Sequence, residues 1–272
     1  MIAFLRRTVI GALLIAVIVL GVFLPPITLI PLILLWIFLA SLEFTALLRM
    51  MNVPLPTLLL PLVNLVFPVS LLVDFAFRGG TPGSIHLAEL LLPCTVVSLC
   101  VLFARPPRAP QLGYGVFGII YLSFLPAHLI MIRYLPSIPP MIVLYPLLAT
   151  WINDTGAYGF GRWLGRHKLS EISPNKTWEG FVAGVIVTIV FSVLYLARYL
   201  PGANSISSAV LGLALGVAAQ VGDLVESIFK REAGVKDSSR ALSEHGGFLD
   251  RADSLLFTLP AFYYYFIFLL PR

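Results

Sequence analysis

The chain contains very little charge. Only 11% of its 272 residues are Asp, Glu, Lys or Arg, whereas 59% are hydrophobic. Ordinary soluble domains have about 25% charged residues and about 45 to 50% apolar ones. The composition therefore excludes an ordinary soluble domain and indicates an integral membrane protein.

Cysteine is also scarce. Cys94 and Cys100 are the only two, and they lie six residues apart within one apolar run. A disulfide framework or a zinc site needs further partners at characteristic spacings, which this run does not supply. We expect both thiols to serve as packing residues.

Several common nucleotide-binding and catalytic motifs are missing. The sequence has no Walker motif, no GxGxxG fingerprint, no CxxC pair and no GxSxG elbow. These absences argue against a soluble type of nucleotide fold. The net charge of +5 does not indicate a nucleic-acid partner, because in a chain that crosses a membrane repeatedly it mostly reports topology.

Long apolar runs dominate what is present. A bilayer core about 30 Å thick needs about 20 apolar residues per helix. By this measure the sequence predicts an all-α polytopic membrane protein with about nine transmembrane helices. The expected spans are Thr8–Leu24, Thr28–Leu48, Val53–Phe75, Ser84–Ala104, Gln111–Ile132, Ile138–Phe160, Thr177–Tyr199, Ser205–Lys230 and Ser254–Leu270.

The distribution of Lys and Arg predicts the orientation. Most of the 18 basic residues fall in the segments that nine spans and a cytoplasmic N-terminus would place inside. We read the first span as a retained helix, because Phe23-Leu-Pro-Pro26 follows it where a signal peptide would have a cleavage pattern. We expect a multi-pass protein of the cell membrane whose long polar loops face the cytoplasm.

The charged residues divide the chain in two. Ten of the 13 acidic residues lie between Asn153 and Asp253. We therefore expect residues 1–140 to form a lipid-facing scaffold and residues 141–272 to carry catalytic loops. The isolated Glu43, Asp74 and Glu89 receive no predicted role, and we expect them at interfacial positions.

The first polar cluster runs from Asn153 to Arg166. Here Asp154 is expected to end an apolar helix, and four glycines follow it. Small residues let membrane helices approach closely, so a purely structural interpretation stays open beside a functional one.

The second cluster, Ile172–Gly180, precedes the seventh span. Ser173, Asn175 or Thr177 is suited to cap that helix. A helix N-terminus beside Lys176 is equally a ready site for an anion.

The third cluster begins at Gly222 and continues to Asp253. At helical spacing Asp223, Glu226, Ser227 and Lys230 share one face. Ion pairs within a helix contribute only about 0.2 to 0.5 kcal/mol in water, which does not account for carboxylates at membrane depth. Such residues indicate a functional site.

Asp250 and Asp253 are three residues apart and could supply a second pair of carboxylates if the loop folds back. Carboxylates from two segments suit Mg²⁺, which often binds one or two protein carboxylates and keeps waters or substrate phosphates. The surrounding Lys and Arg residues indicate phosphate handling. They are Lys176, Lys230, Arg231, Lys236, Arg240 and Arg251.

These clusters closely resemble phosphatidate cytidylyltransferase, also called CDP-diacylglycerol synthase. The matching segments are Asn153-Asp-Thr-Gly-Ala-Tyr158, Gly161-Arg162, Ser173-Pro-Asn-Lys-Thr-Trp-Glu-Gly180, Gly222-Asp-Leu-Val-Glu-Ser227, Lys230-Arg231, Lys236-Asp237 and His245-Gly-Gly-Phe-Leu-Asp-Arg-Ala-Asp253. The resemblance implies that CTP and phosphatidic acid give CDP-diacylglycerol and pyrophosphate. It also implies a homodimer in the lipid bilayer.

The resemblance further implies roles for individual residues. Asp223 and Asp250 would hold Mg²⁺, with Glu226 or Asp253 nearby and room for a second cation. The implied catalytic residues are Asp223, Lys230, Arg231, Lys236, Asp237, His245 and Asp250. The implied substrate-binding residues are Asp154, Ser173, Asn175, Lys176, Thr177, Ser227 and Arg251.

Two alternatives remain at this point. A related CTP-dependent membrane enzyme, such as a CDP-archaeol synthase or a polyprenol or phytol kinase, would share the charged loops. An ion-coupled transporter would also carry intramembrane acids, although its site would lie nearer the bilayer midplane.

Overall fold

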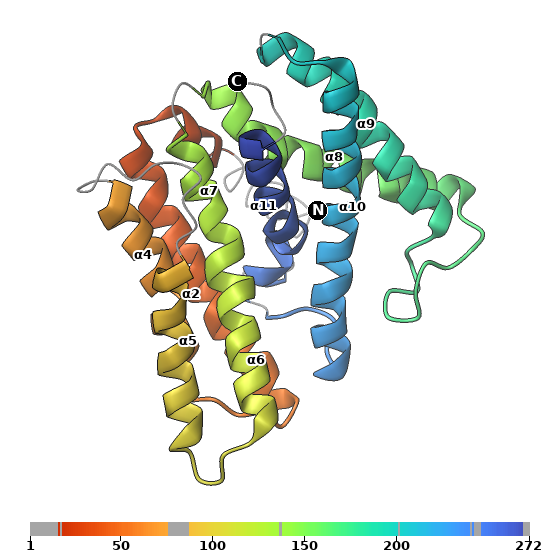
Figure 1. Cartoon of the computed structure of the whole chain (residues 1–272). Coiled ribbons are helices and arrows are strands. Elements are labelled where there is room, and N and C mark those ends of the chain that lie inside the picture. The colour runs from red at the N-terminus through yellow and green to blue at the C-terminus, as the bar shows by residue number, and fades with distance from the viewer. Residues whose placement is uncertain are drawn as a thin grey trace. The chain divides into compact units, whose positions relative to one another are not determined.

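The computed structural model describes residues 16, 18–75, 87–135, 138–200, 202–239, 241 and 246–268. Within these ranges the regular elements are helices, and the only β-type pairing is one isolated bridge. The predicted all-α fold is confirmed. The chain forms two compact units, residues 1–136 with 232–251 and residues 137–231 with 252–272, and Figure 1 labels their helices.

The first unit is built from the N-terminal helices. Helix α2 begins with a proline at its first position, where the missing N–H costs nothing, and it ends before Asn52, which has a positive φ of 61°. The chain then continues through short helices and one long segment with a π-helical turn. The elements are α2 (Pro26–Met50), α3 (Leu59–Val63), α4 (Val66–Val73), α5 (Leu87–Leu102), α6 (Ala109–Ile119), η2 (Ile120–Phe124) and α7 (Leu125–Arg133).

Aromatic side chains and one buried amide hold this unit together. The Phe44 ring lies 6.2 Å from that of Tyr121, and both side chains are buried. Asn64 donates to Ser41 Oγ at 2.8 Å, and its carbonyl accepts from Ser123 Oγ at 2.6 Å. These bonds to neighbouring helices lie where the structure divides the predicted Val53–Phe75 span into α3 and α4.

The second unit contains the four remaining helices, apart from the last residue of α10. They are α8 (Pro140–Leu164), α9 (Trp178–Tyr199), α10 (Ser205–Glu232) and α11 (Asp253–Phe268). The expected end of the sixth span at Phe160 is wrong, because α8 continues to Leu164. Asp154 lies inside this helix, so the expectation that it ends an apolar helix is also wrong.

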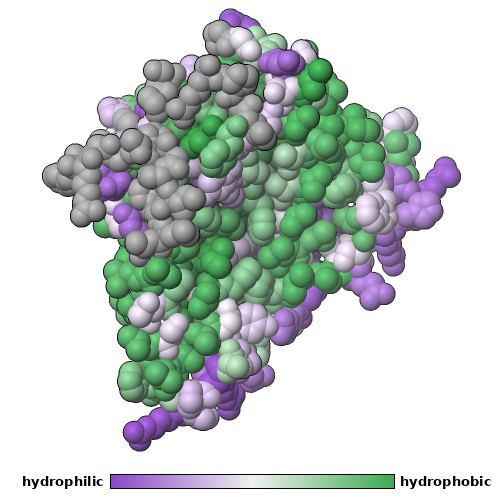
Figure 2. All heavy atoms as spheres, in the orientation of Figure 1, coloured by the Kyte–Doolittle hydropathy of each residue, from purple (hydrophilic) through white to green (hydrophobic). Residues whose placement is uncertain are grey.

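The apolar helices agree with a membrane protein. Among the residues that the structure describes, four helices are long and apolar enough to cross a bilayer: Thr28–Met50, Ala109–Arg133, Trp178–Tyr199 and Ser205–Glu232. Figure 2 shows apolar residues over much of the visible surface, and large side chains such as Leu91, Phe103 and Leu194 are exposed. The span predicted at Thr8–Leu24 lies mostly outside the described residues, so the count of nine and the orientation stay predictions.

Helices α8 and α9 meet through small residues. A Cβ on Gly184 of α9 would lie 2.9 Å from the Asn153 carbonyl oxygen and 3.0 Å from the Ala157 Cβ. A Cβ on Gly180 would lie 2.7 Å from the Ala157 carbonyl oxygen. Of the glycines predicted to pack closely after Asp154, Gly161 takes part in this approach, since its Cβ would lie 3.3 Å from the Gly180 Cα, whereas Gly159 does not.

We expect Gly184→Ala to destabilise the second unit. The added methyl group meets backbone that cannot move away alone, and overpacking of this kind costs about 1 to 3 kcal/mol. Thermal unfolding in detergent should show a midpoint several degrees lower. Gly159→Ala on α8 is the matched control, because nothing lies within 4 Å of its added Cβ. Equal midpoints for the two variants would contradict this account of the interface.

Candidate functional site

A hairpin between α8 and α9 carries the second predicted cluster. Lys168 and Thr177 form an antiparallel bridge, and Leu169 N donates to the Lys176 carbonyl at 2.8 Å. The Glu179 carboxylate accepts from the backbone N–H groups of Arg166 and His167, at 3.1 and 3.3 Å. It also contacts His167 Nδ1 at 2.6 Å. The hairpin is thus tied to the start of α9.

Thr177 caps helix α9. Its hydroxyl oxygen accepts from Gly180 N at 3.1 Å, which confirms one of the three capping candidates. Ser173 contributes through its backbone instead, since its carbonyl accepts from Lys176 N at 3.0 Å. Asn175 is exposed.

The hairpin brings Lys176 to helix α10. Lys176 Nζ lies 2.7 Å from Asp223 Oδ2, and both side chains are partly exposed, at 21% and 32%. The Ser227 hydroxyl donates to Asp223 Oδ1 at 3.4 Å. The predicted second and third clusters therefore meet in the second unit, and Asp223 stays accessible beside a cation.

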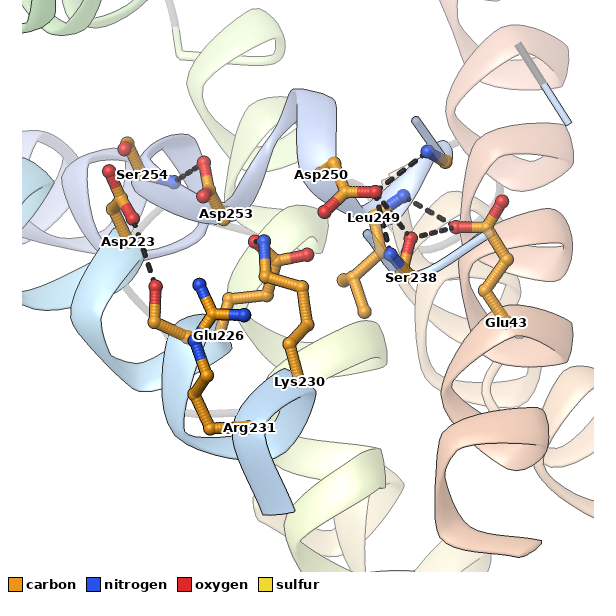
Figure 3. A network of polar contacts seen from close by, with 12 residues as sticks. Glu43, Asp223, Glu226, Lys230, Arg231, Ser238, Leu249, Asp250, Asp253 and Ser254 are labelled. Carbon is orange, nitrogen blue, oxygen red and sulfur yellow. Dashed lines mark hydrogen bonds and ion pairs between the residues drawn. The ribbon is translucent and has the colours of Figure 1, made fainter. Parts of the chain in front are cut away.

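One turn further along α10, Lys230 Nζ lies 2.6 Å from Glu226 Oε2. The Glu226 side chain is fully buried and the Lys230 side chain is 11% exposed. Figure 3 shows these residues with Asp223 along the same helix, as the spacing predicts. A buried carboxylate of this kind needs an ionic or hydrogen-bonding partner to remain charged.

Asp253 joins this group from the start of α11. Burial raises the pKa of its carboxyl, and the negative charge of Asp223 raises the pKa further, whereas a hydrogen bond shared with Glu226 and the charge of Lys230 lower it. Asp154, exposed on α8, lies within electrostatic reach of Asp223, Asp253 and Lys176. The second unit thus gathers four carboxylates and two lysines.

A glycine allows α10 and α11 to meet at this point. A Cβ on Gly222 would lie 2.5 Å from the Asp253 carbonyl oxygen and 3.0 Å from the Ser254 Cα. Because Gly222 directly precedes Asp223, any larger residue there would separate the two aspartates. Their proximity therefore depends on the Gly-Asp pair.

A buried amide network supports the cluster, and sequence analysis did not find it. Gln220 Nε2 donates to Asn153 Oδ1 at 2.6 Å. Asn153 Nδ2 donates to Thr188 Oγ1 at 3.1 Å and to the Gly216 carbonyl at 3.3 Å. The network links α8, α9 and α10 next to Asp154 and Asp223. Its only sequence signal is a lone glutamine on an apolar helix, one turn before Asp223.

Residues 233–239 and 246–251, here called the signature loop because they include part of the matching segment His245–Asp253, lie in the first unit. Asp250 is in the short 3-10 helix η4 (Leu249–Arg251). Its Oδ2 accepts from Ser238 N at 2.9 Å, Ser238 Oγ at 2.8 Å and Gly247 N at 2.7 Å. Gly246 has a positive φ of 76°, which glycine adopts without strain. The Gly-Gly pair of the signature is thereby explained by loop geometry.

Glu43 of α2 contacts the same loop, a role that the sequence analysis did not assign to it. It is 7% exposed and accepts from the backbone N–H groups of Phe248 and Leu249, each at 2.9 Å. Figure 3 shows the Glu43 side chain pointing at Ser238 and the loop. The sequence signal for this contact was a single acidic residue on an otherwise apolar helix.

The remaining predicted residues are placed less closely. Arg231 Nε donates to the Ile172 carbonyl at 3.2 Å, and Lys236, Asp237 and Arg251 are exposed. His245 lies outside the described residues. Asp250 and Asp223 belong to different units, so a metal shared between them stays a prediction. Among the residues described, no three His, Cys, Asp or Glu side chains form a metal-binding group by themselves.

We expect Asn153→Ala to lower stability, because it leaves the buried Gln220 amide without an acceptor. An unsatisfied buried polar group costs about 1 to 3 kcal/mol. Thr155→Ala, on the same helix, is the matched control, since the exposed Thr155 hydroxyl donates only to the Trp151 carbonyl of its own helix. Thermal unfolding midpoints in detergent would measure both; equal midpoints would exclude a stabilising role for the network.

Comparison with known proteins supports the interpretation of the charged clusters. The model of a family described as the cytidylyltransferase family matches residues 5–269. A phosphatidate cytidylyltransferase of Synechocystis is 35% identical over 216 residues, which is 68% of this chain and 73% of that protein. The Bacillus subtilis phosphatidate cytidylyltransferase is 37% identical, over 70% of each chain.

Shorter alignments with other relatives reach higher identity. A phosphatidate cytidylyltransferase of Staphylococcus aureus is 50% identical over 121 residues, 43% of this chain and 46% of that protein. The resemblance predicted from the sequence motifs is confirmed. The match along nearly the whole chain and the identity to these relatives show that the chain belongs to the cytidylyltransferase family.

Proposed function

We propose that this protein transfers CMP from CTP to phosphatidic acid, producing CDP-diacylglycerol and pyrophosphate for phospholipid synthesis. The observation that carries the proposal is the meeting of Lys176 with Asp223, within a membrane-type helical fold whose relatives are named phosphatidate cytidylyltransferases. A hydrophilic nucleotide and a lipid must react at one place, and apolar helices with a polar cluster provide both environments.

The reaction needs charge neutralisation more than acid–base catalysis. A phosphate oxygen of phosphatidic acid forms a bond to the α-phosphorus of CTP, and the bond from that phosphorus to the pyrophosphate oxygen breaks. The attacking phosphate is already ionised near neutral pH, so no strong base is required. Lys176, Lys230 and Lys236 are suited to neutralise the triphosphate and the departing pyrophosphate.

We propose Mg²⁺ as the cofactor. Asp223 and Asp250 are the proposed ligands, with Glu226 or Asp253 as further candidates and a second cation as an option. Asp223 fits this role because its carboxylate is partly exposed and carries hard oxygen donors. A few protein carboxylates suffice where waters and substrate phosphates complete the shell. When bound, Mg²⁺ would neutralise phosphate charge.

The other predicted residues are proposed to surround the substrates. Arg231, Asp237 and His245 would orient the site, with His245 contacting phosphate rather than acting as a base. Asp154, exposed on α8 beside the cluster, is the best-placed candidate for a substrate contact. The remaining proposed contacts are Ser173, Asn175, Thr177, Ser227 and Arg251.

We propose a place in the cell membrane with the polar clusters at the cytoplasmic side, where CTP is available. The clustering of basic residues in the predicted inside loops supports this orientation. A homodimer is proposed from the family resemblance alone.

The direct test is pyrophosphate release by purified protein in detergent. Release should require CTP, phosphatidic acid and Mg²⁺ together, and should stop when any one is omitted. Release with an ether-linked phosphatidate but not the ester, or transfer to a free polyprenol, would favour the related CTP-dependent enzymes. Ion uptake by proteoliposomes without any CTP turnover would favour a transporter.

We expect Asp223→Asn and Asp250→Asn each to reduce turnover at least about 100-fold, because a metal contributes several kcal/mol of charge stabilisation in the transition state. The unfolding midpoint of each variant should show that it remains folded. Glu171→Gln makes the same chemical change at an exposed hairpin position and should retain activity. Near-normal turnover in either aspartate variant would overturn its assignment as a metal ligand.

A further inference from the structure

We propose that Glu43 is a positioning residue that sets the geometry of the signature loop and, through it, the carboxylate of Asp250. The importance of this for catalysis rests on the proposed function; the structural part of the inference does not. Glu43 belongs to α2, about 200 residues before the loop in sequence, and both lie in the first unit.

Four hydrogen bonds join Glu43 to the loop. Oε1 accepts from Ser239 Oγ at 2.6 Å and from Phe248 N at 2.9 Å. Oε2 accepts from Ser238 Oγ and from Leu249 N, both at 2.9 Å. Bonds to a charged acceptor are about twice as strong as neutral ones. Glu43 therefore bonds to two parts of the loop, residues 238–239 and residues 248–249.

The same loop residues hold Asp250. Ser238 bonds to Asp250 Oδ2 through its N–H and its hydroxyl, and Gly247 bonds to it through its N–H. The Ser238 hydroxyl thus lies 2.9 Å from Glu43 Oε2 and 2.8 Å from Asp250 Oδ2. A hydroxyl has one proton, so at any moment Ser238 Oγ donates to one of the two carboxylates. Ser238 lies between Glu43 and Asp250 and contacts both (Figure 3).

The loop fits around these carboxylates without spare room. A Cβ on Gly246 would lie 2.7 Å from Asp250 Oδ2, and a Cβ on Gly247 would collide with Ser238 Oγ and Glu43 Oε2. Leu249 is fully buried. About two helical turns before Glu43 on α2, Trp36 Nε1 donates to the Phe248 carbonyl at 2.9 Å. Trp36 and Glu43 are seven residues apart and share a helix face. Helix α2 therefore contacts the loop at two positions along its length.

A purely structural role would stabilise the fold without affecting the metal or the reaction. A positioning role has a different consequence. Displacement of the loop moves Asp250, whereas the proposed CTP contacts outside the loop stay in place. Loss of Glu43 should then lower kcat and raise the Mg²⁺ concentration needed for half-maximal activity, with a smaller effect on the KM for CTP.

The test is Glu43→Gln in the full-length protein. The amide keeps the size of the side chain but replaces one acceptor oxygen by a donor, which faces N–H and hydroxyl donors. We expect amide hydrogen exchange in the peptide spanning residues 246–250 to become about tenfold faster. We expect kcat to fall at least about tenfold, a higher half-maximal Mg²⁺ concentration, and a KM for CTP within about threefold of the wild type.

The matched control is Glu89→Gln on α5, where the carboxyl contacts Ser70 Oγ at 3.2 Å, away from the loop. It should leave exchange at residues 246–250, kcat and the Mg²⁺ dependence unchanged. If Glu43→Gln does not fold, Ser239→Ala removes one of the bonds to Glu43, at 2.6 Å, together with the 3.0 Å bond that Ser239 Oγ accepts from Ala241 N. It should change exchange and kcat in the same directions, by less. Glu43→Asp retains the charge and should recover part of the lost activity.

Unchanged exchange at residues 246–250 in folded Glu43→Gln would overturn the proposal. So would faster exchange with wild-type kcat and Mg²⁺ dependence in an active enzyme. If the wild-type protein shows no CTP turnover, the proposed function fails instead, and the exchange experiment alone decides whether Glu43 holds the loop.

Discussion

The need to satisfy every carboxylate placed among apolar helices controls this structure. Burying a charged group without partners costs several kcal/mol. Glu226 has a lysine one turn away, and Glu43 has four hydrogen-bond donors from one loop. The partner of Glu226 lies on its own helix, whereas the partners of Glu43 come from an irregular polar segment. Glu43 therefore fixes the shape of a segment that the hydrophobic effect alone would leave unspecified.

Close backbone approach is the second requirement, and glycine provides it at chosen places. Gly180 and Gly184 let α9 lie against α8, and Gly222 lets α10 reach the start of α11. The amides of Asn153 and Gln220 then connect three helices whose backbones are already near one another. Lys176 contacts Asp223 within this arrangement of helices. The charged cluster therefore depends on glycines and on uncharged amide side chains.

The helices and much of the second-unit cluster could be predicted from the sequence, because apolar runs and i, i+4 spacing are local properties. The common face of Asp223, Ser227 and Lys230 follows from helical geometry, and the Thr177 cap from residue type. The contacts of Glu43 with Ser238 and of Asn153 with Gln220 could not be predicted, since they join residues 195 and 67 positions apart. The expectation that Asp154 ends a helix was wrong because the glycines and polar residues after it suggest an early end, whereas α8 continues to Leu164.

The separation of Glu43 from its loop also constrains the order of assembly. Helix α2 leaves the ribosome long before Ser238, Phe248 and Leu249 are made, so its carboxylate stays within an apolar segment until those residues exist. The N–H groups of the loop gain their acceptor only when residues about 200 positions later in the chain return to α2. A chain that stops before residue 238 therefore leaves the α2 carboxylate without these donors.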